Sequence, residues 1–201
     1  MGQSVSVTRR QPPEPGGSAR ERVLEAALSR FASAPPVAVS LDDIRREAGV
    51  SVGALYHHFP DKAALVDALH LDLLHQVQTE FVAELRAHPA AEDGIRAIVR
   101  GYLRWVSENR AAAELLLGSR PRDPRLQELN RRFFTEVMSW WQTHVHYGAL
   151  RELPLDLIHA LWLGPAQEYT RHWLSGDVKR IPRTTVGVLG DAAWNALKEP
   201  A

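Results

Sequence analysis

The chain has 201 residues, of which 45% are hydrophobic and 24% charged, a composition typical of a globular protein. Its 24 Lys and Arg residues balance its 24 Asp and Glu residues, which argues against a protein that binds nucleic acid by bulk positive charge. The absence of cysteine excludes disulfide scaffolds, cysteine nucleophiles and cysteine-ligated metal sites. Because no apolar run approaches the roughly 20 residues of a membrane span, we expect a soluble cytoplasmic protein.

Residues 1–17 are polar and rich in Pro and Gly. Such a composition buries too little apolar surface to fold by itself, so we expect a disordered arm. Arg9 and Arg10 make part of this arm basic, which fits either a solvated tail or an arm that lies on a polyanion.

The rest of the chain is patterned as helices, with no convincing strand and no internal repeat. An all-α fold of nine helices is therefore predicted, most of them starting at a capping residue or Pro and ending near Gly or Pro. The sequence Leu163-Gly164-Pro165 predicts a kink inside the eighth helix. The expected helices span about 18–33, 40–48, 51–59, 61–87, 92–109, 114–117, 123–147, 154–175 and 182–198.

The second and third helices indicate a helix-turn-helix. Ser40 and Asp43 suggest a capping box at the start of the second helix, and Gly49 suits the left-handed residue of the turn. Ser51 is placed to cap the third helix, with Leu55 facing inward. In this arrangement the third helix can lie in the major groove of DNA and present its N-terminal residues to base edges.

The third helix carries groups that suit DNA and lacks groups that repel it. No acidic residue lies between residues 49 and 60, so phosphate would not be repelled there. Two adjacent histidines alone are more often plain surface residues. The candidate contacts are Tyr56, His58 and Lys62 for phosphate, Val52, Gly53 and Ala54 for close apolar contact with bases, and His57 for a base edge.

Residues 40–69 read SLDDIRREAGVSVGALYHHFPDKAALVDAL and closely resemble the TetR (tetracycline-repressor-like) family of bacterial transcription regulators. The matching pieces are Asp43-Ile44, residues 48–51, Leu55-Tyr56, Phe59 and residues 62–65. The resemblance extends back to Phe31 and covers about a quarter of the chain strongly; the rest matches in the number and length of its helices.

The resemblance implies a two-domain regulator: a DNA-binding head at 18–62 and a ligand-binding and dimerisation body at 63–201. Two heads of a homodimer would read a palindromic operator in double-stranded DNA, and a small molecule in the body would move them apart and release the DNA. Arg45 replaces the usual Ala, and residues 32–36 replace a usual Gly and aromatic residue. The implied DNA-contacting set is Ser40, Arg45, Ser51, Val52, Gly53, Ala54, Tyr56, His57, His58 and Lys62.

Aromatic residues are concentrated in the expected body, where five of the six tryptophans lie between residues 105 and 173. Any one of them more often fills a core, but the group favours a flat, apolar or aromatic inducer bound between helices. His144, Glu168 and His172 are further polar candidates to orient it. The candidate ligand residues are Tyr102, Trp105, Leu116, Phe133, Trp140, Trp141, His159, Trp162 and Tyr169.

The last helix carries small residues at a spacing of three: Gly187, Gly190, Ala193 and Ala196. Each glycine costs about 1 kcal/mol relative to Ala inside a helix, and close approach of another helix would offset that cost. The partner helix is expected to belong to a second subunit, as the resemblance implies; tight packing within the same chain is the alternative. The candidate dimer contacts are Val186, Leu189, Gly190, Ala193, Trp194 and Leu197.

Two other function classes remain as alternatives. Asp72-x-x-His75 and Asp156-x-x-His159 match the carboxylate–histidine spacing of helical di-iron enzymes, but Leu69 and Leu73 on the inward stripe leave Asp72 and His75 near the surface. No other catalytic motif is present, so we expect no enzyme, no metal and no cofactor. The second alternative is a dimeric sensor or interaction protein without operator binding, against which the intact segment 51–62 argues.

Overall fold

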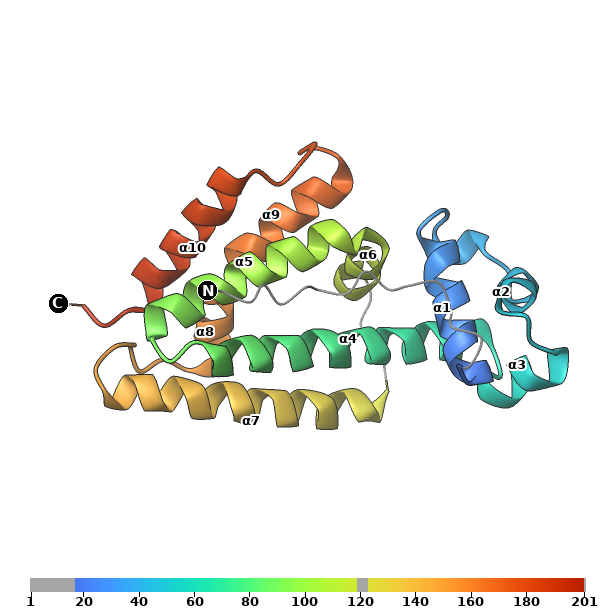
Figure 1. Ribbon diagram of the computed structural model, residues 1–201, viewed down its shortest axis with the longest axis horizontal. Helices are drawn as coiled ribbons and strands as arrows, with labels where there is room; N and C mark the ends of the chain where they lie inside the picture. The colour runs from blue at the N-terminus through green and yellow to red at the C-terminus, as the bar shows by residue number, and fades with distance from the viewer. Residues whose placement is uncertain (1–16, 119–122, 201) are drawn as a thin grey trace, which may run out of the picture. The chain divides into compact units, whose positions relative to one another are not determined.

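The computed structural model describes residues 17–118 and 123–200, and Figure 1 shows their helices. The all-α prediction is confirmed over these residues. The expected arm lies, apart from Gly17, outside them. The elements are α1 (Ala19–Phe31), a 3₁₀ turn η1 (Pro36–Ala38), α2 (Leu41–Ala48), α3 (Val52–His58), α4 (Lys62–Ala87), α5 (Ala91–Glu108), α6 (Arg110–Gly118), α7 (Pro124–His146), α8 (Leu155–Trp162), α9 (Gly164–Ser175) and α10 (Arg183–Leu197).

The described residues form one α-helix more than the nine expected, because the helix expected over 154–175 is two helices. Its first part, α8, ends at Trp162, and α9 begins at Gly164. Pro165 lies in the first turn of α9 and has no N–H to continue the hydrogen bonds of α8. The expected kink is therefore a complete break.

The helix starts follow the capping residues of the sequence, with one shortfall. At α1 the capping box is complete: Glu21 N donates to Ser18 Oγ (3.2 Å), and Ser18 N donates to Glu21 Oε2 (2.8 Å). At α2, Asp43 N donates to Ser40 Oγ (3.1 Å), but the Asp43 carboxylate accepts from the Ser40 hydroxyl rather than from its N–H. Asp is one methylene shorter than the Glu of a full capping box.

The described chain divides into two compact units, and the division falls inside α4, between Leu69 and His70. We call the first unit the head and the second the body. The head packs α1, α2, α3 and the first turns of α4 around a small apolar core. Its most buried side chains are Val23, Leu24, Ala27, Ile44, Leu55, Phe59, Leu65 and Leu69. The functional boundary expected at residue 62 stays a prediction.

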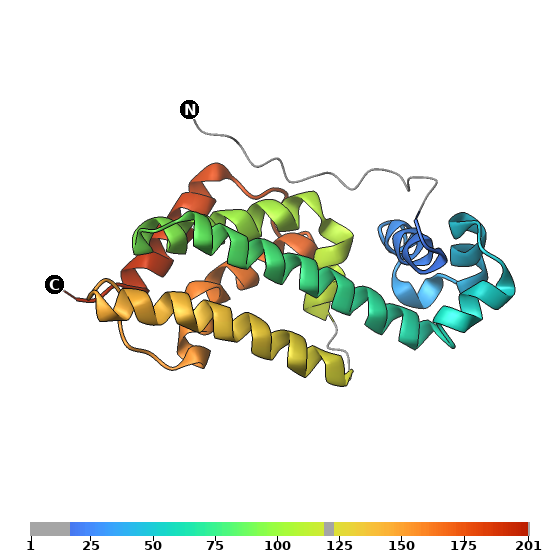
Figure 2. The ribbon, with the colours of Figure 1, turned by 60° about the horizontal axis from the view of Figure 1, so that its bottom comes forward.

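The body contains the rest of α4 and helices α5 to α10, and its helices pack at two different spacings. The backbone of α10 stays within 8 Å of α5 over much of its length, whereas α4 and α7 approach no other body helix so closely over any extended stretch. Figures 1 and 2 both show α7 running beside α4. Large side chains fill the wider spacing, including Phe81 of α4 and Phe133 of α7, whose ring centroids lie 5.2 Å apart.

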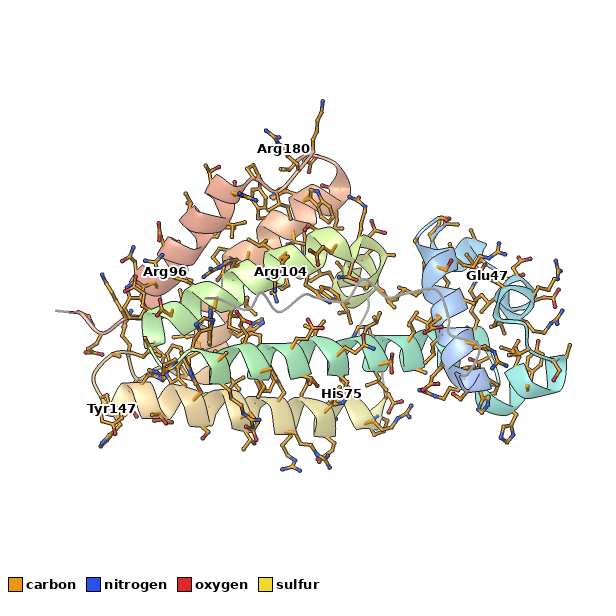
Figure 3. All side chains as sticks on the ribbon, viewed as in Figure 1. Glu47, His75, Arg96, Arg104, Tyr147 and Arg180 are labelled. Atoms are coloured by element: carbon orange, nitrogen blue, oxygen red, sulfur yellow. The ribbon has the colours of Figure 1, made fainter. Side chains whose placement is uncertain are left out.

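Among the described helices, none is both long and apolar enough to cross a lipid bilayer. The inward stripe expected on α4 is confirmed, since Leu69 and Leu73 are buried. His75 is exposed on the same helix, and Figure 3 shows where it lies.

Candidate functional site

The turn between α2 and α3 is fixed by local geometry and by burial. Gly49 ends α2 with φ +62°, a left-handed conformation that other residues adopt at a cost. Ser51 caps α3 by accepting a hydrogen bond from Ala54 N (3.2 Å). Val50, Leu55 and Phe59 are buried on the inner side. Together they hold α3 against α1 and α2 and determine which of its faces points outward.

The outward face of α3 is open. Val52 is 56% exposed and Tyr56 52%; Gly53, His57 and His58 are exposed as well, and Ala54 is half-buried. A Cβ added at Gly53 would meet no heavy atom within 4 Å, so its backbone can be approached closely. The structure thus exposes three of the four expected base-reading residues, Val52, Gly53 and His57, together with the expected phosphate contacts Tyr56 and His58. We call this exposed, acid-free set the α3 face (Val52, Gly53, Tyr56, His57 and His58).

The two expected cations are held by the head itself. Arg45 donates to Asp42 Oδ1 (2.8 Å) and to the Val50 carbonyl (3.2 Å), so it braces the turn. Lys62 Nζ donates to the Val37 carbonyl in η1 (3.2 Å), which ties the first loop to α4. An ammonium has three donors and a guanidinium five, so neither contact precludes a second one with phosphate. Phosphate contact by Arg45 and Lys62 stays a prediction.

Most other cations of the head are also engaged. Arg30 pairs with Glu47, labelled in Figure 3, and Arg46 pairs with Asp42. Hydrogen bonds from Arg45 and Arg46 lower the pKa of Asp42. Arg22 donates to the carbonyls of Ala48 (3.2 Å) and Gly17 (2.6 Å). Little unneutralised charge remains between residues 17 and 62, so DNA binding must depend on the geometry of a few contacts more than on bulk attraction.

In the body, several of the expected ligand residues lie in one aromatic cluster. Trp162 is its centre: its ring centroid lies 5.5 Å from that of Phe81, 6.0 Å from Trp140 and 5.9 Å from Trp141. Tyr102 and Phe133 pack against the same core. Trp141 and Trp162 are buried, and their indole N–H groups donate to the carbonyls of Arg151 (3.2 Å) and Ile95 (3.1 Å). These two tryptophans are therefore structural as well as candidate contacts.

Most of the other expected ligand residues lie outside this core, whereas the His144 ring lies against the cluster, with its centroid 4.1 Å from that of Trp140. His159, Glu168 and His172 are all exposed. His172 Nε2 lies 3.6 Å from Glu168 Oε1. His144 is buried, with Nδ1 2.9 Å from the Trp140 carbonyl and Nε2 3.1 Å from the Pro89 carbonyl, so it braces the α4–α5 turn. The remaining members, Trp105, Leu116 and Tyr169, are partly buried elsewhere in the body.

Sequence reasoning missed two residues of α4 at the aromatic cluster. The sequence pattern places Phe81 only on an apolar stripe, yet its ring touches both Phe133 and Trp162. Gln78, one turn before Phe81, is buried and donates to Asn130 of α7 (2.8 Å). The sequence offered one signal for Gln78: it is a polar residue three positions before the apolar Phe81, on a side of the helix that faces inward.

Three of the six predicted dimer contacts need a correction; the other three, Val186, Leu189 and Trp194, are half-buried and stay predictions. Gly190, Ala193 and Leu197 are buried within their own chain, where α10 packs on α5. A Cβ added at Gly190 would lie 3.8 Å from the side chain of Arg96, labelled in Figure 3. Gly190 and Ala193 therefore allow close packing inside the chain and are not available to a partner. The outward face of α10 is instead formed by Arg183, Thr184, Gly187, Val188, Asp191, Ala192 and Asn195.

Comparisons with known proteins agree with the geometry of the head. The family model described as bacterial regulatory proteins, tetR family, matches residues 23–69. The HTH-type transcriptional regulator BetI of Cronobacter sakazakii is 29% identical over 167 residues, which cover 73% of this chain and 79% of BetI.

Solved structures agree in fold. A TetR family transcription regulator from Marinobacter aquaeolei VT8 superimposes with a TM-score of 0.72 at 20% identity, covering 90% of this chain and 96% of that one. A putative TetR family regulator from Vibrio parahaemolyticus gives 0.73 at 20% identity, covering 91% and 100%. Residues 23–69 thus match the TetR family of bacterial regulatory proteins, and the described chain has the fold of TetR family regulators. Together with the similarity to BetI, this match supports a DNA-binding transcriptional regulator.

Proposed function

We propose that this regulator is a repressor that binds a palindromic operator as a homodimer and leaves it when a small apolar or aromatic molecule binds in the body. The observation that carries this proposal is the α3 face, which is exposed, free of acidic residues and held in place by buried Leu55 and Phe59. A face of this kind can enter the major groove without unfolding or charge repulsion.

Each head would make two kinds of contact. Val52, Gly53 and Ala54 would approach base edges and thymine methyl groups, and His57 would hydrogen-bond to a base edge. The predicted phosphate contacts are Ser40 at the start of α2, Tyr56, His58, Lys62 and Arg45. Ser51 would act indirectly, because its side chain already caps α3.

The dimer would form through outward surface in the last part of the body. Val188 is 65% exposed at the centre of the outward face of α10, and α9 also has an outward face with exposed Pro165, Glu168 and His172. A pair of helices from each subunit, as the family resemblance implies, would bury Val188. Two heads per operator would also compensate for the small free charge of each head.

Operator binding is tested by selecting bound fragments from the source genome and then measuring affinity for the selected operator. The double variant Tyr56→Ala, Lys62→Ala should weaken binding to operator and scrambled duplex alike. It should also flatten the dependence of log affinity on log salt by about one unit, because Lys62 is the one charged residue of the two and only a charged contact releases a counterion.

Tyr147→Ala is the matched control, because Tyr147 is an exposed tyrosine of the body (Figure 3). It should leave both the affinity and the salt slope unchanged. Unchanged binding by the Tyr56, Lys62 double variant would show that the α3 face is not the DNA surface.

A further inference from the structure

Gln78 leaves one buried polar atom without a partner. The side chain is only 7% exposed, and its Nε2 donates to Asn130 Oδ1 (2.8 Å). Its Oε1 is shielded from solvent and accepts no hydrogen bond from any residue that the structure describes. A buried acceptor left unpaired costs about 1–3 kcal/mol, so a native protein that keeps one gains something from it.

Tyr102 leaves a second such atom on the facing helix. Its hydroxyl oxygen is buried and makes no hydrogen bond of normal geometry to the described residues. Burial raises the pKa of Tyr102, and the nearby Thr170 hydroxyl opposes that shift. However, Thr170 Oγ1 donates its own proton to the Ala166 carbonyl (2.8 Å). The Thr170 oxygen keeps its lone pairs and can accept from the Tyr102 hydroxyl, so of these two buried atoms Gln78 Oε1 is the one that has no candidate partner among the described residues.

Gln78 and Tyr102 lie a similar number of residues from the turn that joins α4 and α5. Helix α4 ends at Ala87 and α5 begins at Ala91, and the two run antiparallel beside each other (Figures 1 and 2). Gln78 precedes this turn and Tyr102 follows it by about ten residues each, or roughly three helical turns. Gln78 also lies one turn from Phe81, which belongs, like Tyr102, to the residues packed around the aromatic core.

The side chains around Gln78 indicate which kind of ligand could bind there. Aromatic rings dominate, with Phe81, Phe133 and Trp162 in edge-to-face contact. Among the side chains that the structure describes, the buried polar ones are His70, Gln78, His144 and Thr170, and no Asp, Glu, Lys or Arg is buried. A charged ligand would find no buried counter-ion here, and burying an unpaired charge is costly.

We propose that the effector is an uncharged aromatic molecule carrying a hydroxyl or N–H group, which donates a hydrogen bond to Gln78 Oε1. This proposal rests on the proposed ligand-responsive body and names the chemical class of its ligand. Phenols are the simplest members of the class. Helix α4 is widely spaced from α5 and α7. The ring of the ligand would lie among the large side chains that bridge these helices.

The test compares three probes of similar size by isothermal titration calorimetry with the full-length protein: 4-methylphenol, 4-methylanisole and benzyltrimethylammonium. The phenol should bind at least about tenfold more tightly than the anisole, which cannot donate, since one hydrogen bond of about 1.4 kcal/mol gives a tenfold ratio. Equal affinity, no measurable binding of any probe, or preferred binding of the ammonium would each overturn the proposal.

Variants locate the preference. Gln78→Leu should abolish the difference in affinity between phenol and anisole, whereas Tyr102→Phe and Gln142→Leu, the latter at an exposed position of α7, should leave it unchanged. If Gln78→Leu fails to fold, Gln78→Met and the ranking of probes on the unmodified protein decide the question. A preference for the phenol that is retained in Gln78→Leu or Gln78→Met would overturn the assignment of the site.

Operator binding measured on the same samples separates this inference from the proposed function. Operator binding without any preference for the phenol would remove the ligand class and leave the DNA-binding proposal standing. If the unmodified protein binds no operator, that result would instead count against the proposed function.

Discussion

The head and the body differ in whether their candidate site residues are exposed or buried. In the head they are on the surface: Val52 and Tyr56 point outward from α3, while Leu55 beside them is buried. In the body they are in the interior, where Trp141 and Trp162 are buried. A surface site can change without altering folding, whereas an interior site shares its residues with the core. Changes in the head should therefore alter DNA affinity first, and changes in the body should alter stability first.

The largest expected effect is on the stability of the body. Trp141→Ala removes a fully buried ring and the hydrogen bond to the Arg151 carbonyl. Such truncations cost about 3–5 kcal/mol of unfolding free energy, measured by chemical denaturation. The folded fraction should retain its affinity for the operator. A loss below about 1 kcal/mol would mean that the aromatic cluster is not a core and would weaken the comparison.

The next effect separates the two faces of α10. Ala193→Leu inserts a larger side chain where α10 packs closely on α5, and overpacking of this kind costs about 1–3 kcal/mol. Ala192→Leu, at the exposed neighbouring position, should stay within about 0.5 kcal/mol. Equal effects at the two positions would contradict the burial of the predicted dimer residues within their own chain.

Two glycines of the head should respond in opposite ways. Gly49→Ala must adopt φ +62° and should destabilise the head by about 1 kcal/mol. Gly53→Ala has open space around its Cβ and should stabilise α3 by up to about 1 kcal/mol, yet weaken operator binding because a methyl group would meet the bases. Thermal unfolding and operator titration of both variants check this; unchanged affinity in Gly53→Ala would argue against close backbone approach.

The smallest effect is an acid dependence of the head. Hydrogen bonds from Arg45 and Arg46 lower the pKa of Asp42 below 3.8, so its ion pairs stabilise the fold at neutral pH and are lost as pH falls through the lowered pKa. Asp42→Asn should lower the melting temperature slightly at pH 7, and the difference from the unmodified protein should shrink in acid. A difference that grows in acid would contradict this assignment.

The sequence predicted the elements that depend on local chemistry. Ser51, Gly49 and Gly176 mark helix ends in the structure as expected. It predicted less well what depends on distant neighbours. The spacing of Gly190 and Ala193 indicates close helix packing, but only the fold shows that the other helix is α5 of the same chain. Whether Pro165 bends or breaks a helix also depends on packing around it.

The candidate site shows the same division. The α3 face could be predicted because the turn and the caps fix its orientation within a few residues. The polar atoms of Gln78 and Tyr102 could not, because their surroundings come from α4, α5, α7 and α9 together. Phe81 was visible only as part of a stripe, although it joins two other helices of the body.

The most direct test is the affinity of a His57→Ala variant for the selected operator and for a scrambled duplex at one salt concentration. His75→Ala, at an exposed histidine of α4 (Figure 3), is the control. If the α3 face reads bases, His57→Ala should lower operator affinity by about 1–3 kcal/mol while binding to scrambled DNA and the melting temperature stay unchanged. An unchanged ratio of operator to scrambled affinity would contradict the central claim.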